Sequence, residues 1–388
     1  MPDRSAAPEF FALSDDHRAI REMARAFAAE KLAPHAIEWD QARHFPVAEM
    51  RQAAALGMAG IYVRDDVGGS ALTRLDAALI FEALAAGCPA VSAFISIHNM
   101  TAWMIDRHGS DAQRRRWLPS LVTMQKLASY CLTEPSAGSD AAALKTRAAR
   151  DGDHYILNGQ KQFISGAGND DDLYVVMVRT GGDGPKGISA LVVEGGTPGV
   201  AFGVNERKMG WNAQPTRAVI FENARVPVAN RLGEEGAGFR IAMAGLDGGR
   251  LNIGACSLGG AQSALEKSIA YMGERKAFGR KLNEFQALQF KLADMATELE
   301  AARMLLYSAA AAYDRGDPGA TSKCAMAKRF ATDTGFNVAN EALQLHGGYG
   351  YLADYGIEKI VRDLRVHQIL EGTNEIMRVI IARGLAGR

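Results

Sequence analysis

Cysteine is scarce in this sequence, and its few copies lie far apart. Four cysteines occur among 388 residues, at Cys88, Cys131, Cys256 and Cys324, and none forms a CxxC pair. No histidine stands at a metal-ligand spacing from them, so neither a disulfide framework nor a zinc site is expected. We predict four reduced, mostly buried thiols and no bound metal.

Net charge and long apolar runs are also missing. Lysine plus arginine total 44 and aspartate plus glutamate total 44, so the formal charge is zero and nucleic-acid binding is not expected. No uninterrupted apolar run approaches the roughly 18 residues of a membrane span. The first residues lack the order of a signal peptide, and Asp3, Glu9, Asp15 and Asp16 argue against a transit peptide. We therefore expect a cytoplasmic protein without a membrane span.

Helical periodicity dominates the first third of the chain, whose full length allows two or three domains of roughly 100–200 residues each. Ser14 or Asp15 can cap an opening helix in which Ile20, Met23 and Phe27 fall on one face. Later segments repeat this pattern between glycines and prolines. We predict an all-helical N-terminal domain over residues 1–125.

The composition of residues 126–235 is that of a β domain. Asn158-Gly159 lies between two runs of β-branched and aromatic residues and is typical of a type I′ hairpin turn. Further strands are expected in the short runs at 173–178, 188–193 and 218–221. The segment 182–187 has GxGxxG spacing, but a strand is predicted after it where a dinucleotide site needs a helix. It is therefore interpreted as a hairpin loop.

Long helices are predicted over residues 236–388. One of them carries apolar residues at steps of three and four, which suits packing against other helices or another subunit: Leu288, Leu292, Met295, Leu299, Ala302 and Leu306. Another is expected over 322–345, and a third begins near Thr373 or Asn374. The order helical, β and helical predicts an α+β multidomain protein with the divisions 1–125, 126–235 and 236–388.

Three segments combine polar groups with glycine in a way that suits ligand binding. The loop 130–140, YCLTEPSAGSD, offers several hydroxyls around Gly138, which allows close approach to a phosphate or a heteroaromatic edge. The segment 274–280, ERKAFGR, joins cations to an aromatic residue, and 344–350, QLHGGYG, places three glycines after a helix. Taken singly, these are equally typical of a capping loop, a solvated basic face and a helix stop.

The segment 366–378, VHQILEGTNEIMR, contains the candidate base. Glu371 follows two apolar residues and precedes Gly372 and Thr373. A carboxylate in an apolar pocket has a raised pKa, which suits a general base. The simpler alternative is a glutamate that complements the positive end of a helix dipole.

Together these segments resemble the acyl-CoA dehydrogenase family, and the resemblance covers nearly the whole chain. The five motifs YCLTEPSAGSD, NGQKQFISGAG, ERKAFGR…FQ, LHGGYGY and EGTNEIMR stand in that family's order and approximate spacing. The resemblance implies a helical N-terminal domain, a middle β-barrel-like domain and a C-terminal four-helix bundle. Further stretches, such as GPKGISALVVE, are most similar to branched-chain members that act on isobutyryl-CoA.

The resemblance also implies the chemistry. Members bind FAD and oxidise the α–β bond of an acyl-CoA thioester, with a base that removes the α-proton while hydride passes to the flavin. By position that base is Glu371. Some relatives carry the base at the position of Gly249, and glycine cannot serve as one. The reduced flavin passes electrons to electron-transfer flavoprotein, and the assembly is a homotetramer built as a dimer of dimers.

Further residues are assigned by matching the family's motifs. The residues expected to bind FAD are Tyr130, Leu132, Thr133, Gly138, Ser139, Phe163, Ile164, Ser165, Arg275, Phe285, Gln286, Gln344, Gly347, Gly348, Thr373 and Glu375. Those matching the ADP half, from Arg275 to Gly348, come partly from a neighbouring subunit in the family. The substrate contacts expected are Ser139, Asp247, Arg250 and Gly372.

The acyl group is less narrowly defined. Leu370 stands where straight-chain relatives often carry tyrosine, so a 2-methyl branch is expected to fit beside the base. Isobutyryl-CoA, converted to methacrylyl-CoA in valine catabolism, is the preferred substrate, with 2-methylbutyryl-CoA and butyryl-CoA as alternatives. An acyl-CoA oxidase and an inactive flavin-binding interaction protein are the alternative functions, and the presence of Glu371 argues against the second.

Overall fold

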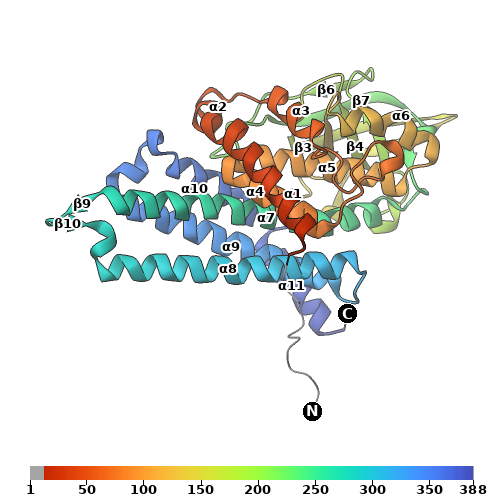
Figure 1. Ribbon diagram of the computed structural model, residues 1–388. Coiled ribbons are helices and arrows are strands. Elements are labelled where there is room, and N and C mark those ends of the chain that lie inside the picture. Colours follow the sequence, from red (N-terminus) through yellow and green to blue (C-terminus); the bar gives the residue numbers. More distant parts are fainter. Residues whose placement is uncertain (1–12, 388) are drawn as a thin grey trace, which may run out of the picture.

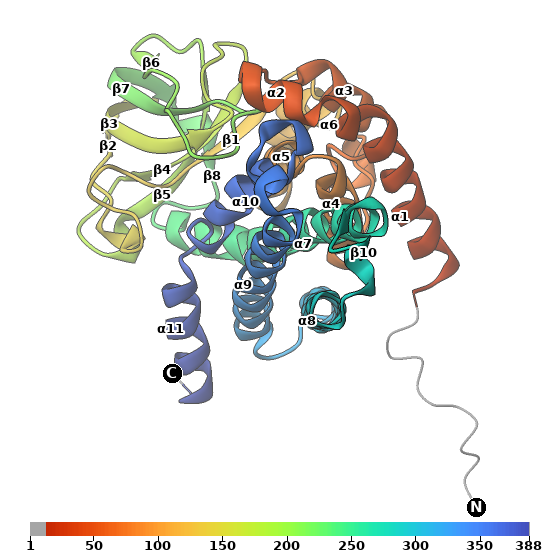
Figure 2. The same cartoon turned by 90° about the vertical axis from the view of Figure 1, so that its left-hand side faces the viewer.

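The computed structural model describes residues 13–387 (Figure 1). Residues 1–12 and 388, the outer ends of the first and last predicted domains, lie outside the described residues. Three long helices lie side by side at one end of the molecule, and the N-terminal helices and the β-strands are stacked beside them (Figures 1 and 2).

Helices make up the first part of the chain, as predicted. They are α1 (Asp15–Phe27), α2 (Ala36–Ala42), α3 (Val47–Ala55), α4 (Arg74–Gly87), α5 (Pro89–His108) and α6 (Asp111–Val122). Ser14 caps α1, because its hydroxyl accepts from the His17 amide while the His17 ring accepts from the Ser14 amide. Helix α4 is buried on nearly all sides, since α1, α5 and the long helix α7 (Gly238–Glu274) surround it.

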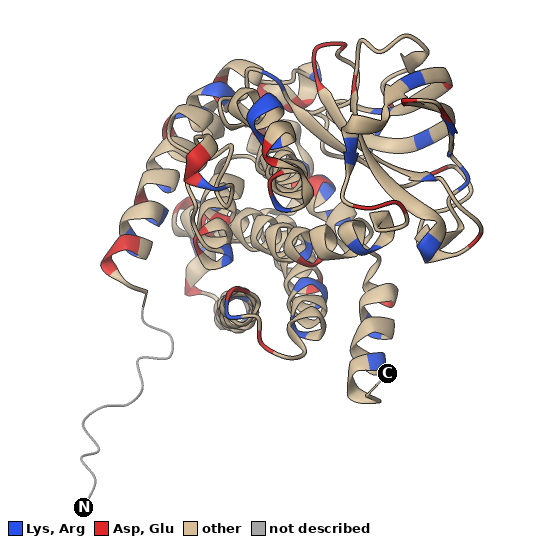
Figure 3. Cartoon of the chain, turned by 90° about the vertical axis from the view of Figure 1, so that its right-hand side faces the viewer, with Lys and Arg blue, Asp and Glu red and all other residues tan. Residues whose placement is uncertain are grey.

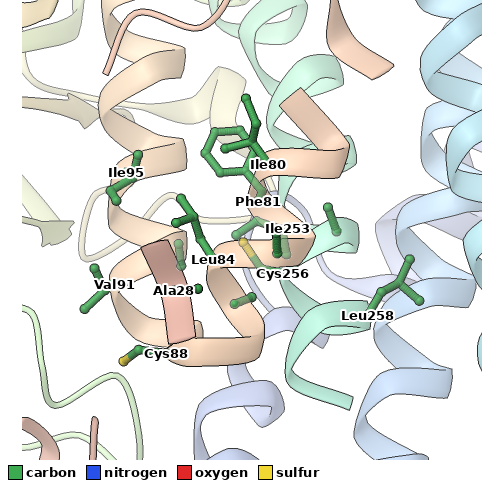
Figure 4. Close-up of a cluster of buried hydrophobic side chains, with 14 of the residues drawn as sticks. Ala28, Ile80, Phe81, Leu84, Cys88, Val91, Ile95, Ile253, Cys256 and Leu258 are labelled. Atoms are coloured by element: carbon green, nitrogen blue, oxygen red, sulfur yellow. The ribbon is translucent and has the colours of Figure 1, made fainter. Parts of the chain in front are cut away.

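The main core joins the N-terminal helices to the C-terminal ones. Figure 4 shows Phe81 and Leu84 of α4 in one cluster with Ile95 of α5 and with Ile253 and Cys256 of α7. Burial of such apolar side chains stabilises each by roughly 1.5–3 kcal/mol. The helical layers therefore share one continuous core and hold α7 in place against α4.

Strands form the middle of the chain, as predicted. They are β1 (Ala128–Cys131), β2 (Arg147–Asp151), β3 (His154–Ser165), β4 (Leu173–Arg179), β5 (Ile188–Glu194), β6 (Val200–Phe202), β7 (Thr216–Pro227) and β8 (Arg231–Leu232). Within residues 13–387 these eight form one sheet in the order β6-β7-β3-β2-β4-β5-β8, with β1 paired in parallel to β4. Every residue of β4 is buried, since one face packs on α5 and α7 and the other on the remaining strands.

The hairpin turn predicted at Asn158-Gly159 is wrong. Both residues lie inside β3, where the register against β7 slips and forms a β-bulge. Asn158 exchanges hydrogen bonds with Asn223 on the partner strand, at 2.9 and 3.1 Å. The hairpin instead turns at Gly152-Asp153, and Gly152 has the φ of +60° that a tight turn requires. The segment 182–187 does connect β4 to β5, as predicted.

Long helices return after the sheet. α7 leads through the small strands β9 (Lys276–Ala277) and β10 (Arg280–Lys281) to α8 (Gln286–Asp314), α9 (Ala320–His346), α10 (Ile357–Arg365) and α11 (Asn374–Leu385). The apolar seam of α8 packs inside the chain, because Met295, Leu299 and Leu306 belong to the main core with α7 and α9. The seam is therefore part of the bundle, and the shorter helices α10 and α11 both pack against α9.

All four cysteines lie within the described residues, where each is buried and none forms a disulfide. Over the same range, no helix combines the length and the apolar character that crossing a membrane would require. Basic and acidic residues alternate over the cartoon instead of gathering by sign (Figure 3).

Candidate active site

The turn that carries Glu371 lies between α10 and α11. Glu371 and Gly372 both have positive φ angles, +57° and +91°. A glutamate in this left-handed region is strained, so the surrounding structure has to hold it there. Thr373 then caps α11, because its hydroxyl accepts from the Ile376 amide at 3.3 Å. Glu371 is therefore presented from a constrained turn ahead of the helix and not from its first turn.

The Glu371 side chain is half-buried, and one of its two carboxyl oxygens is enclosed by protein. Its Oε2 atom is buried, and no residue between 13 and 387 forms a hydrogen bond with it. Burial raises the pKa of Glu371 to about 7, although the charges of Arg250 and Lys328 act in the opposite direction. A carboxylate that is half ionised near neutral pH has the proton affinity of an effective general base.

Gly249 on α7 leaves the space that this carboxyl occupies. A Cβ atom at Gly249 would lie 2.5 Å from Glu371 Oε2 and 3.0 Å from the sulfur of Met100. Both distances are shorter than van der Waals contact. A side chain at position 249 and a carboxyl from position 371 therefore compete for the same volume, so the glycine on α7 and the predicted base at 371 are sterically linked.

Asp247 and Arg250, two of the predicted substrate contacts, lie directly beside the base. Arg250 Nη1 donates to Asp247 Oδ1 at 2.6 Å, and its Nε donates to the Glu371 carbonyl at 3.3 Å. The Thr321 hydroxyl donates to the other oxygen of Asp247 at 2.6 Å. Both side chains thus help to hold the Glu371 turn, and a contact with substrate stays a prediction.

Lys328 and Asn374 also hold the turn, and sequence reasoning missed both. The Lys328 ammonium donates to the Gly372 carbonyl at 2.9 Å and to Asn374 Oδ1 at 2.8 Å. Lys328 is completely buried, on the face of α9 that also carries Cys324 and Ala331. A lysine on the apolar face of a predicted helix was the signal that could have revealed it.

A third buried cation, Arg74, lies near Glu371. The Arg74 guanidinium stacks on the Tyr62 ring at 3.6 Å, and within the described part of the chain its terminal nitrogens make no hydrogen bond. The Tyr62 hydroxyl accepts from Asn252 on α7 at 3.1 Å. Burial raises the pKa of Tyr62. The charge of Arg74 acts to lower this pKa, and the charge of Glu371 acts to raise it. No sequence motif pointed to this cluster.

The loop 130–139 is tied to β3 by a buried ion pair. Lys161 Nζ lies 2.7 Å from Glu134 Oε1 and donates to the Leu132 carbonyl at 3.1 Å. Glu134 also accepts from the amides of Lys145 and Thr146, at 2.6 and 2.9 Å. These contacts leave few alternative conformations for the loop and place it beside the bulge in β3.

That bulge turns Phe163 outward. The pairing register of β3 with β7 slips between Lys161 and Ile164. At this slip Phe163 has a φ of +60°, and its side chain is 63% exposed. The Gln162 amide donates to the Thr133 carbonyl at 2.8 Å, which joins the two predicted cofactor segments. The Ile164 side chain packs in the sheet core, so a contact of Ile164 with the cofactor, which stays a prediction, is left to its backbone. Ser165 is half-buried beside it.

The residues around this loop fit a flavin. The Tyr130 hydroxyl is buried and has no hydrogen-bond partner within residues 13–387, as expected of a donor that waits for a ligand. A Cβ at Gly138 would meet no atom of the described chain within 4 Å, and Gly138 and Ser139 are exposed. With exposed Phe163 at its edge, this open rim can accept an aromatic ring and a phosphate. Thr373 uses its hydroxyl to cap α11, and Glu375 is exposed.

The other predicted FAD residues lie at the far end of α7. Arg275, Gln344, Gly347 and Gly348 line a hollow of about 730 Å³ beside the β9–β10 hairpin, at the end of the bundle that faces the viewer in Figure 2. Phe285, whose ring centre lies 3.9 Å from the Arg280 guanidinium, is the N-cap residue of α8, and the exposed Gln286 is the first residue of that helix.

The chain does not bring these two groups of predicted FAD residues together. Helix α7 separates Arg250 from Arg275 by 25 residues, which corresponds to about 37 Å at 1.5 Å per residue. This distance exceeds the length of an extended flavin dinucleotide. One cofactor bound beside Glu371 therefore cannot also reach the hollow of the same chain.

Comparison with known proteins places the whole chain in one family. Family models match its three consecutive parts: the acyl-CoA dehydrogenase N-terminal domain over residues 14–125, the middle domain over 129–224 and the C-terminal domain over 236–386. The chain belongs to the acyl-CoA dehydrogenase family. Its predicted fold class, helical domains around a middle sheet domain, is thereby confirmed.

Individual members of the acyl-CoA dehydrogenase family are similar over nearly the full length. Mitochondrial isobutyryl-CoA dehydrogenase from Bos taurus is 57% identical over 373 residues, covering 96% of this chain and 89% of the relative. The protein of the same name from Dictyostelium discoideum is 58% identical over 375 residues, covering 96% and 90%. The structure of butyryl-CoA dehydrogenase from Megasphaera elsdenii has a TM-score of 0.93 at 39% identity, covering 97% and 99%.

Proposed function

We propose that this protein is a FAD-dependent acyl-CoA dehydrogenase that oxidises isobutyryl-CoA to methacrylyl-CoA, a reaction of valine degradation. The observation that carries the chemistry is the half-buried Glu371 carboxyl, whose enclosed Oε2 atom forms no hydrogen bond with any other described residue. Two isobutyryl-CoA dehydrogenases at 57% and 58% identity support the choice of substrate.

Glu371 removes the α-proton of the thioester. Its pKa of about 7 lets the carboxylate form persist at neutral pH and still accept a proton. The Glu371 amide takes part in no hydrogen bond within residues 13–387, so it is available to the thioester oxygen, where negative charge develops. Arg250 donates to the carbonyl of the same residue, which lies in the following peptide unit, and so helps to hold the turn that carries this amide. FAD, when bound, supplies the acceptor for the hydride that leaves the β-carbon.

Loop 130–139 and the segment 163–165 would hold the flavin, and the carboxyl of Glu371 would face the α-carbon from the other side of the thioester. Ser139, Asp247, Arg250 and Gly372 remain the proposed substrate contacts. Leu370 packs against the main core beside the base, so its size influences the space next to the acyl branch. One methyl group is worth about 1–3 kcal/mol in such a pocket, so 2-methylbutyryl-CoA and butyryl-CoA are expected to react more slowly.

Oligomerisation is part of the proposal. The separation of about 37 Å along α7 supports a cofactor shared between two chains, in which the hollow at Arg275 and Gly347 serves the flavin of a neighbouring copy. A homotetramer built as a dimer of dimers follows the family pattern. Electron-transfer flavoprotein is the proposed electron acceptor, the cytoplasm the proposed location, and 1–125, 126–235 and 236–388 the proposed domain division.

The test is an anaerobic titration of the purified holoenzyme with a panel of short acyl-CoAs. Isobutyryl-CoA should bleach the flavin fastest and yield methacrylyl-CoA. The variant Glu371→Gln should retain the flavin colour and bind the CoA ester, but lose flavin bleaching. Glu22→Gln, which changes an exposed carboxyl on α1, is the matched control and should behave as the wild type.

Three outcomes contradict the proposal. Near-normal bleaching in Glu371→Gln removes the assigned base. Faster bleaching by butyryl-CoA than by isobutyryl-CoA overturns the substrate. Rapid stoichiometric release of peroxide when oxygen is admitted assigns the protein to the acyl-CoA oxidases instead.

A further inference from the structure

The turn that carries Glu371 is held by two buried cations. Its two successive carbonyls each accept a hydrogen bond, the Glu371 carbonyl from Arg250 at 3.3 Å and the Gly372 carbonyl from Lys328 at 2.9 Å. Arg250 lies on α7 and Lys328 on α9, so the turn is hydrogen-bonded to two helices of the bundle. Hydrogen bonds from charged donors are about twice as strong as neutral ones.

A network on α9 fixes Lys328 in turn. Its ammonium also donates to Asn374 Oδ1 at 2.8 Å, and the Asn374 amide donates to Asp333 Oδ1 at 2.7 Å and to the Thr332 hydroxyl at 3.0 Å. Asn374 is the first residue of α11. One turn of α9 therefore binds both the exit of the Glu371 turn and the start of the following helix.

The charges around the base and around Lys328 overlap. The charges of Arg250 and Lys328 act to lower the pKa of Glu371, and the charge of Glu371 acts to raise the pKa of the Tyr62 and Tyr130 hydroxyls. The charged groups that act on the pKa of Lys328 are Glu371, Arg250 of α7, Asp333 of α9 and Glu375 of α11. Burial lowers the pKa of the His367 ring, and the charge of Lys328 lowers it further.

Burial lowers the pKa of Lys328 to about 7, while Glu371 raises it. Near neutral pH the two groups are therefore coupled: the ammonium stabilises the carboxylate, and the carboxylate stabilises the ammonium.

We propose that Lys328 is the positioning residue of the base: its ammonium group holds the Glu371–Gly372 turn through the Gly372 carbonyl and supplies positive charge that favours the carboxylate form of Glu371. The proposal extends the function proposed above and rests on it for the role of Glu371. It does not require Lys328 to touch substrate or cofactor.

Three substitutions separate the charge from the hydrogen bond. Lys328→Gln keeps an amide donor near the Gly372 carbonyl but has no charge. Lys328→Met loses both, and Lys328→Arg keeps both. Lys359→Met is the matched control, because Lys359 is also a buried lysine, paired with Asp363 at 2.7 Å, and its charge does not act on Glu371.

The first readout is the titration of the Glu371 carboxyl in the full chain, followed by infrared difference spectroscopy with ¹³C-labelled glutamate and assigned by its loss in Glu371→Gln. The second is the single-turnover rate of flavin bleaching by isobutyryl-CoA as a function of pH. The third is the affinity for the CoA ester. Thermal denaturation of each variant reports its stability.

In Lys328→Gln the carboxyl should titrate about one pH unit higher, which lowers its ionised fraction at pH 7 from about one half to about one tenth and slows bleaching about fivefold. Affinity for the CoA ester should change less than about twofold. Lys328→Arg should restore the wild-type titration of the Glu371 carboxyl. Lys359→Met should lower the melting temperature but leave the titration of the Glu371 carboxyl unchanged. If Lys328→Met does not fold, Lys328→Gln carries the test.

A wild-type titration in Lys328→Gln, or an equal displacement in Lys359→Met, overturns the role of Lys328. If instead the carboxyl titration moves as expected but no acyl-CoA bleaches the wild-type flavin, the positioning role stands and the proposed function fails.

Discussion

Replacing Gly249 by alanine tests the packing of the base most directly. The new Cβ would lie 2.5 Å from Glu371 Oε2 and 2.9 Å from the carboxyl carbon, whereas van der Waals contact needs about 3.5 Å. The carboxyl therefore has to retreat by roughly 1 Å. A displacement of this size in a reacting group costs about 100-fold in rate, so we expect flavin bleaching by isobutyryl-CoA to fall by that factor.

The stability of Gly249→Ala should behave differently from its activity. Alanine is favoured over glycine inside a helix by about 0.5–1 kcal/mol, and the sulfur of Met100, at 3.0 Å, belongs to a flexible side chain. The variant should therefore fold and bind flavin. Gly273→Ala, on the same helix, is the control, because a Cβ at Gly273 would lie 3.9 Å from the nearest neighbouring atom, Nδ2 of Asn283. Stopped-flow bleaching that differs by less than about threefold between the two variants would refute the reasoning.

Further predictions concern pH, the flavin loop and the first helix. The folded-state pKa of Glu371 lies above its unfolded value, so its carboxyl destabilises the fold as pH rises from about 4.5 through about 7. Glu371→Gln should therefore melt above the wild type at pH 8 and with it at pH 4, and a lower melting temperature at pH 8 would contradict this. Wild-type bleaching should accelerate as pH rises through about 7. Lys161→Met, which strands the buried Glu134, should lower the free energy of unfolding in urea by about 3–5 kcal/mol and weaken flavin binding; a loss below about 1 kcal/mol would count against it. Ser14→Ala should cost about 1 kcal/mol in the same assay, and no change would deny its cap a role.

Local signals predicted most elements correctly. The cap at Ser14, the periodicity of α8 and α9 and the strand after 182–187 are each read within a few residues, because backbone angles and amphipathic faces act over that range. The Asn158-Gly159 dipeptide shows the limit. Both a hairpin turn and a β-bulge accept glycine with positive φ, and only the pairing of β3 with β7 decides between them.

The site shows the same division. The resemblance carried by the motifs led to Glu371, Arg250 and the loop 130–139, but it could not show why position 371 suits a base. Lys328, 43 positions before Glu371, was missed, because its place on the apolar face of a helix indicates burial but only the folded chain brings it to the Glu371 turn.

The amino-acid order by itself therefore determined the succession of helices and strands, the family and the identity of the candidate base. Tertiary structure alone decided that Gly249 leaves room for the Glu371 carboxyl and that Arg250 and Lys328 hydrogen-bond to the Glu371 turn. It also decided that Arg275 lies too far from this turn to bind the same cofactor. The physical reason is range. Backbone preferences act between neighbours, whereas steric exclusion, burial and charge act between helices that are distant in sequence and meet only in the folded chain.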